Sequence, residues 1–203
     1  MSKLTFDRSV PVVVALLATV ALAGCGSADP STARAVVTSS TAAAPDSFGA
    51  ADILFVQMMI PHHQDAVTMA ELARTRSQNP GIRGVAEQIS SIQQPQIDTM
   101  ISWVQAVGRP TAPPDFNTGH GVGEHAVPGT MTFTDLVRLR ESSGARFDRK
   151  FLTVMIRHHR GTLRAAKAEL AEVSSPEVKA IGQDMVAKQK AELKTLRQIL
   201  AQL

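Results

Sequence analysis

The sequence predicts an all-α protein, a four-helix bundle built from two tandem helical hairpins. An offset of 96 positions aligns two halves of the chain without a gap, which indicates an internal repeat. Apolar residues recur at helical spacing through both halves, and no stretch shows the strict alternation of a strand. The aligned pairs include Asp52 and Asp148, Phe55 and Phe151, Met59 and Met155, His62 and His158, Pro80 and Pro176, and Gln93 and Gln189.

Residues 1–24 predict an export signal. Lys3 and Arg8 give a short positive region, and the apolar run that follows is too short for a comfortable membrane span. The run ends in Leu-Ala-Gly-Cys25, which resembles a bacterial lipobox. We therefore expect lipidated Cys25 to anchor an exported protein to the outer face of the cytoplasmic membrane. An ordinary cleaved signal beside an incidental cysteine is the alternative.

Composition limits the remaining possibilities. Cys25 is the only cysteine, so the mature chain cannot form an internal disulfide. Residues 25–45 are rich in Ala, Ser and Thr without apolar periodicity, which is typical of a flexible tether. The formal charge of +3 falls to +2 without residues 1–24, which hold Lys3, Arg8 and Asp7. This mild balance, with no basic stripe interleaved with aromatics, gives no indication of nucleic-acid binding.

Repeat one spans 48–107 of a helical domain that covers 46–203. Its first helix is expected to begin at a cap on Asp46 or Ser47 and to end near Gln78. Pro61 lies inside this helix, where we expect a kink beside the histidines. A second helix, over 80–107, follows an asparagine cap and a proline, and contains Pro95 as a further breaker.

A connection over 108–143 joins the repeats. It begins as a Pro/Gly-rich loop that carries His120, Glu124 and His125, which are either solvated or a source of one extra ligand. A short helix capped by Thr132 or Thr134 ends it. Repeat two, over 144–203, predicts helices over 145–173 and 176–203, the second after a serine cap and a proline.

Three strings carry a resemblance to a known family: Met59-Ile-Pro-His-His-Gln-Asp-Ala-Val-Thr-Met-Ala70, Phe147-Asp148 with Met155-Ile-x-His-His, and Gln93…Ile97…Met100…Trp103. They resemble domain-of-unknown-function family 305, over nearly all of 48–203. The resemblance implies an exported or membrane-anchored bacterial protein with a ferritin-like bundle, and some members bind copper and support copper resistance.

The two repeats differ in their potential ligands. Met69, seven residues after the first histidine, is matched by Ala165 in repeat two. The position three after the glutamine of the second helix is Gln96 in repeat one and Glu192 in repeat two. A site that used both halves would therefore be asymmetric.

The His-His steps have the chemistry of a transition-metal site. Imidazole suits copper and zinc, and the thioethers at helical spacing from it select Cu(I). The folded domain offers no thiolate for a Cys-rich zinc site and no Glu-x-x-His step for di-iron chemistry. No nucleophile or metalloprotease motif is present, so we expect no enzymatic activity.

We therefore predict a membrane-anchored protein that binds copper for sequestration or handling. The candidate ligands are His62, His63, His158 and His159, with Met59, Met69 and Met155 as softer partners. The alternative is a structural or partner-binding lipoprotein whose histidines form a buried polar layer without metal. Convergence of the two His-His steps in the fold would favour metal binding; placement at opposite ends of the bundle would oppose it.

Overall fold

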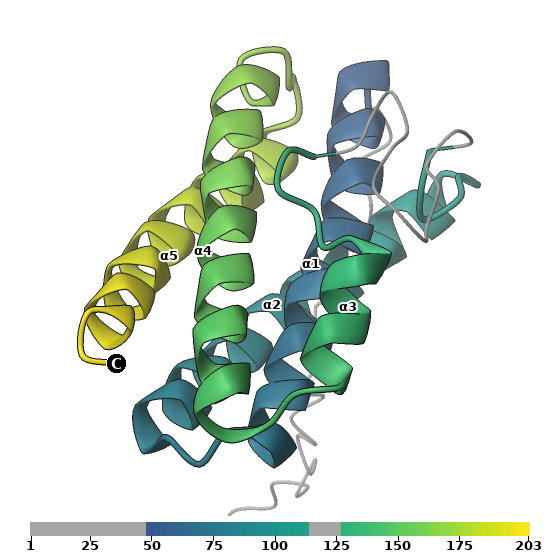
Figure 1. Ribbon diagram of the computed structural model, residues 1–203. Coiled ribbons are helices and arrows are strands. Elements are labelled where there is room, and N and C mark those ends of the chain that lie inside the picture. Colours follow the sequence, from purple (N-terminus) through teal and green to yellow (C-terminus); the bar gives the residue numbers. More distant parts are fainter. Residues whose placement is uncertain (1–47, 114–126) are drawn as a thin grey trace, which may run out of the picture. The chain divides into compact units, whose positions relative to one another are not determined.

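A computed structural model describes residues 48–113 and 127–203 (Figure 1). The predicted signal segment, the tether with Cys25, and the loop residues His120, Glu124 and His125 lie outside the described residues. Among the helices of the described part, none is both long and apolar enough to cross a membrane.

Five helices make up the described part of the chain, and it contains no strand. They are α1 (Ala50–Arg76), α2 (Pro80–Ala106), α3 (Phe133–Arg140), α4 (Gly144–Glu169) and α5 (Pro176–Leu200). The short turns make α1–α2 and α4–α5 helical hairpins, and α1 also packs on α4 while α2 packs on α5. The short α3 lies against α1 and α4 (Figure 1). The predicted all-α bundle is confirmed.

Capping side chains set most helix starts where the sequence predicted them. Asn79 Oδ1 accepts the N–H of Gly81 at 2.9 Å, and Ser175 Oγ accepts that of Val178 at 3.3 Å. Thr132, rather than Thr134, caps α3. Neither Pro61 nor Pro95 ends its helix: α1 and α2 are assigned as helix throughout their length.

The first helix begins later than predicted, at Ala50, because its cap comes from inside the helix. The N–H of Gly49 donates to Asp52 Oδ2 at 2.8 Å, and that carboxylate also binds the α4–α5 turn. The ends of α1, α4 and α5 lie at Arg76, Glu169 and Leu200, two to four residues before the predicted ends.

Two separate apolar clusters form the core. The Phe151 cluster includes Phe147, Phe151 and Met155 of α4 with Met69, Ile89 and Leu196 from the other long helices. The Phe55 cluster includes Phe55 and Met59 of α1 with Trp103, Ala165 and Met185. Every long helix contributes residues to both clusters. Along each of these helices, buried polar residues lie between the part that joins one cluster and the part that joins the other. Those residues define the candidate site.

Candidate metal centre

A layer of buried polar side chains separates the two apolar clusters; we refer to it as the central polar layer. All four long helices contribute, and the most exposed member, Gln96, is only 8% exposed. The layer consists of His62 and His63 from α1, Gln93 and Gln96 from α2, His158, His159 and Thr162 from α4, and Gln189 and Glu192 from α5. The two His-His steps therefore converge in the middle of the bundle.

His62 and His158 are in direct contact across the bundle. Their rings stack with centroids 3.6 Å apart and an interplanar angle of 27°. His158 Nε2 lies 2.9 Å from the backbone carbonyl oxygen of His62, so this nitrogen carries a proton and donates it. A neutral His158 then has its lone pair on Nδ1, which has no hydrogen-bond partner in the described residues.

Thr162 fixes the other ring in a complementary way. Its hydroxyl donates to the carbonyl oxygen of His158 at 3.3 Å and lies 3.3 Å from His62 Nδ1. Since a hydroxyl has one proton, this assignment makes His62 Nδ1 the donor to Thr162 Oγ1. The lone pair of His62 is then on Nε2, which also lacks a partner within the described residues. Each ring of the stacked pair thus has one uncommitted lone pair.

The outer histidines of the layer differ from each other. His159 Nε2 lies 2.7 Å from Glu192 Oε2, and both side chains are fully buried. His63 has no such carboxylate, because the aligned position is Gln96, whose amide donates to Asp184 Oδ2 at 3.0 Å. His63 makes no hydrogen bond of ordinary geometry in the described part of the chain, but the Gln96 side chain and the Met59 backbone lie near it and partly offset the lowering of its pKa by burial. The asymmetry expected from the sequence is therefore present in the layer.

Burial keeps three of the histidines neutral. It lowers the pKa of His62 and of His158 well below the ordinary value, and the neighbouring imidazoles lower both further. Burial also lowers the pKa of His63 to about 4. Neutral imidazole is the form that binds metal ions, so near neutral pH these rings need lose no proton before binding.

The candidate methionines flank the layer from both sides. Met59, Met69 and Met155 are fully buried, but Met59 belongs to the Phe55 cluster while Met69 and Met155 belong to the Phe151 cluster. Among the described residues, no group of three or more His, Cys, Asp or Glu side chains is placed to hold a metal ion. An ion bound by several of the histidines therefore requires side-chain rotation within the layer.

A strap of chain, Val127–Met131, crosses α4 beside this layer. Gly161 allows the crossing: a Cβ there would lie 1.3 Å from the carbonyl oxygen of Pro128. Gly129, at a φ of 87°, also lies close to α4, since its Cβ would be 2.5 Å from the carbonyl oxygen of Arg157. The strap then reaches α1, where the N–H of Met131 donates to Asp65 Oδ2 at 3.1 Å.

Asp65 therefore contacts the strap. Its burial raises its pKa to about 7, against which the hydrogen bond from Met131 acts only in part. The layer residues Gln93 and Gln189 could have been suspected from their alignment at the 96-residue offset. Thr162 could not, because it aligns with Ala66.

Comparison with known proteins identifies the family. The model of the family described as "Domain of unknown function (DUF305)" matches residues 52–200. The chain belongs to the DUF305 family. The family resemblance seen in the sequence is thus confirmed, and the resemblance extends over the whole helical bundle. No curated protein matches the chain.

Several solved structures are similar to the bundle. A Streptomyces coelicolor protein described as secreted is 29% identical, with 75% of this chain and 91% of that chain covered and a TM-score of 0.66. A DUF305 fragment from Deinococcus radiodurans is 28% identical, with 77% and 99% covered and a TM-score of 0.68. CopM in its Cu(II)-bound form is 32% identical, with 74% and 96% covered and a TM-score of 0.63. CopM is also described in Cu(I)-bound and Ag-bound forms.

Proposed function

We propose that this DUF305 protein is exported, anchored to the membrane through Cys25, and binds copper at the central polar layer for sequestration or handling. The observation that carries the proposal is the set of buried imidazole nitrogens without partners where the two His-His steps meet. A buried polar atom without a partner costs about 1–3 kcal/mol. Sites that retain several such atoms call for an explanation, of which a bound ion is one.

The donor set suits copper. The uncommitted lone pairs of His62 Nε2 and His158 Nδ1 belong to rings in contact, and burial keeps both rings neutral. A neutral His63 adds one further imidazole lone pair to the layer. Thioethers of Met59, Met69 and Met155 flank the layer and favour Cu(I) over harder ions. The similar CopM structures in Cu(I)-bound and Cu(II)-bound forms support the same choice of metal.

Bound copper would serve storage or transfer in this site. The four histidines of the layer are fully buried among the four long helices, which suits retention of an ion better than its contact with a substrate. In the metal-free layer each of these imidazoles has a buried ring nitrogen with no hydrogen-bond partner among the described residues. Coordination of copper by His62, His63, His158 and His159 would give these nitrogens a partner. The methionines would help to retain the reduced ion.

The test is a titration of the mature protein with Cu(I) under reductant and with Cu(II), followed by elemental analysis after desalting. We expect retained copper in the wild type and loss of it in the double variant His62→Ala/His158→Ala. The matched control is Met100→Leu, a volume-conserving change of a buried residue outside the layer. A double variant that retains as much copper as the wild type would overturn the assignment of the site.

The alternative function, a structural or partner-binding protein, is favoured by one specific contact. The fully buried pair of His159 and Glu192 satisfies one ring nitrogen and one carboxylate oxygen without any metal. If the other polar side chains of the layer also served only to satisfy one another, added copper would leave the melting temperature of the wild type unchanged. A metal that binds only the native state raises that temperature.

The anchor is tested separately. We expect the wild type in the membrane fraction and the variant Cys25→Ser in the soluble extracytoplasmic fraction, because an acyl chain supplies the attachment. Mass spectrometry of the N-terminal peptide should show the added acyl mass in the wild type. Recovery of both proteins in the soluble fraction would contradict the anchor and leave the copper site untouched.

A further inference from the structure

Positive charge is concentrated on α3 and α4. The segment 133–169 holds nine Lys and Arg residues and four Asp and Glu residues, a net charge of +5 against +3 for the full chain. One of the four acids, Asp148, is buried, and another, Asp135, is paired with Arg157 at 2.5 Å. The modest charge of the whole sequence therefore hides a strongly basic region and a remainder that is slightly acidic.

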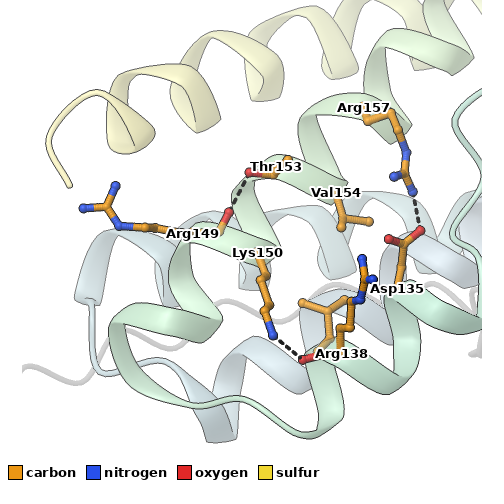
Figure 2. A pocket seen from close by; sticks show the side chains of 8 residues that line it. Asp135, Arg138, Arg149, Lys150, Thr153, Val154 and Arg157 are labelled. Atoms are coloured by element: carbon orange, nitrogen blue, oxygen red, sulfur yellow. Dashed lines mark hydrogen bonds and ion pairs between the residues drawn. The ribbon is translucent and has the colours of Figure 1, made fainter.

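Six of these nine cations line two adjoining pockets. A pocket of about 350 Å³ between α3 and α4 is lined by Arg138, Arg149, Lys150 and Arg157 (Figure 2). A second pocket, of about 410 Å³, is lined by Arg157, Arg160 and Arg164, and the two pockets share Thr153 and Arg157. We call these six cationic residues and the two pockets between them the α3–α4 basic face. Asp135 is the only carboxylate that lines either pocket.

Internal contacts occupy only part of this positive charge. Figure 2 shows Lys150 Nζ donating to the carbonyl oxygen of Arg138, and Arg157 reaching Asp135. Arg149 donates to the terminal carboxyl oxygen of Leu203. Thus two of the six cations contact a carboxyl group in the described structure, and the face keeps an excess of positive charge.

The chemistry and extent of the face suit an array of phosphate groups. Guanidinium groups bind phosphate through a planar fork of donors, and five of the six cations are arginines. From residue 149 to residue 164 the face extends about 22 Å along α4, too far for a single phosphate ion. Phe133, at the start of α3, is 55% exposed, and apolar side chains such as Phe on basic helices are typical of surfaces that bind a bilayer interface.

We propose that the α3–α4 basic face docks on a surface of anionic phospholipid headgroups. The proposed anchor makes such docking possible: residues 25–47, if extended, span at most about 80 Å, against about 39 Å for the length of α4. The domain can therefore lie with α4 along the membrane. A lipid anchor and a basic surface together give stable attachment where a single acyl chain gives little. This role is separate from copper binding.

The test measures vesicle binding by the mature chain from residue 25, carrying Cys25→Ser so that no acyl chain contributes. The vesicles contain phosphatidylcholine alone or phosphatidylcholine with one-third phosphatidylglycerol, and no metal is added. The test variant is Arg138→Glu/Arg160→Glu/Arg164→Glu. The matched control is Arg83→Glu/Lys188→Glu/Lys194→Glu, which changes the net charge equally at exposed positions of α2 and α5 outside the two pockets.

We expect binding to the anionic vesicles only, and its loss at high salt. The test variant should bind at least about 100-fold more weakly, since each basic residue near an anionic surface strengthens binding roughly fivefold and the introduced glutamates add repulsion. The control should stay within about threefold of the wild type, since its charges lie off the docking face. Circular dichroism that shows unchanged helix content establishes that all three proteins are folded.

Three results would overturn the proposal. The first is no binding of the wild type to anionic vesicles, and the second is equal weakening by the test and control variants. The third is preference for another phosphate source, shown by release from vesicles with millimolar inorganic phosphate or by tighter binding to a DNA duplex. None of these results bears on copper, which is measured on the protein without vesicles.

Discussion

His158 Nε2 donates a hydrogen bond to the backbone carbonyl oxygen of His62, 2.9 Å away, while the two imidazole rings stack. The residues are 96 positions apart in the sequence and lie at the centre of the bundle. The carbonyl of His62 is thus tied to the opposite helix, α4. Each ring keeps one nitrogen uncommitted as a consequence.

Copper should stabilise the protein through this pair. A ligand that binds the native state alone at 100 times its dissociation constant adds about 2.7 kcal/mol. We expect Cu(I) to raise the melting temperature of the wild type and to leave that of His62→Ala/His158→Ala unchanged. Differential scanning calorimetry with and without metal checks this. Zn(II) is the comparison ion, and an equal shift with zinc would contradict the role assigned to the methionines.

Acid should destabilise the metal-free protein in a defined range. The folded-state pKa values of His62, His63 and His158 lie below the ordinary value, so the unfolded chain binds protons first as the pH falls. The contribution of these three histidines to the free energy of unfolding should therefore be highest above pH 6.5 and should decrease as the pH falls toward about 4, the value for His63. Urea unfolding across this range measures it. The double variant His62→Leu/His158→Leu should show a smaller decrease in the free energy of unfolding over this range.

Asp52 should contribute strongly to stability. Its Oδ1 accepts the N–H groups of Ser174 and Ser175, each at 2.9 Å, and its Oδ2 accepts the Ser174 hydroxyl at 2.7 Å. Asp52→Ala should lower the free energy of unfolding by about 2–4 kcal/mol, because several hydrogen bonds to a charged group are lost and buried N–H groups remain. Glu87→Gln, at an exposed position of α2, is the control and should change it by less than about 0.5 kcal/mol.

The contribution of Asp52 should also depend on pH. Burial raises its pKa, but the hydrogen bonds from Ser174, Ser175 and Gly49 together lower it below the ordinary value. A carboxylate with a lowered folded-state pKa stabilises the protein above its unfolded pKa, and this contribution is lost as the pH falls through the folded value. The difference between the wild type and Asp52→Asn should therefore be largest near neutral pH and shrink in strong acid.

The helices were predictable because local signals determine them. Asn79 and Ser175 before their prolines placed the starts of α2 and α5, and the helical spacing of apolar residues gave the bundle. The start of α1 was not predictable from nearby caps. Asp52 lies inside the helix and satisfies groups at Gly49 and 122 positions away at Ser174, and only the tertiary structure brings these together.

Of the candidate site, the four histidines could be singled out from the sequence, but most other members of the layer and its geometry could not. A buried polar layer formed by both His-His steps was one of the two alternatives that the sequence left open, and all four histidines are buried. The stacking of His62 on His158 depends on the rotation of α1 relative to α4, which the sequence does not specify. The strap was not predictable either. In the sequence Gly161 looks like any glycine inside a helix, and only the structure shows that it makes room for Pro128, 33 positions earlier.

Gly161 should tolerate no side chain. The Cβ of Gly161→Ala would overlap the carbonyl oxygen and carbon of Pro128, at 1.3 Å and 2.4 Å, so the strap must move away. We expect a loss of at least about 1–3 kcal/mol in the free energy of unfolding, as for other overpacked sites. Gly84→Ala on α2 is the matched control: nothing lies within 4 Å of its Cβ, and it should gain roughly 0.5–1 kcal/mol of helix stability. Equal effects of the two changes would show that the strap does not contact Gly161 in solution.

Asp65 should make the protein less stable as the pH rises from about 4 to about 7. Burial raises its folded-state pKa to about 7, so over this range the folded protein holds a proton that the unfolded chain has released. The variant Asp65→Asn keeps an acceptor for the N–H of Met131 but has no such proton, so its stability relative to the wild type should increase across the same range. Urea unfolding at several pH values measures the difference, with Asp98→Asn on the exposed face of α2 as a control that should show no such trend. If the difference in the free energy of unfolding between the wild type and Asp65→Asn stays constant from pH 4 to pH 7, Asp65 is ionised in the folded protein and the expected proton is absent.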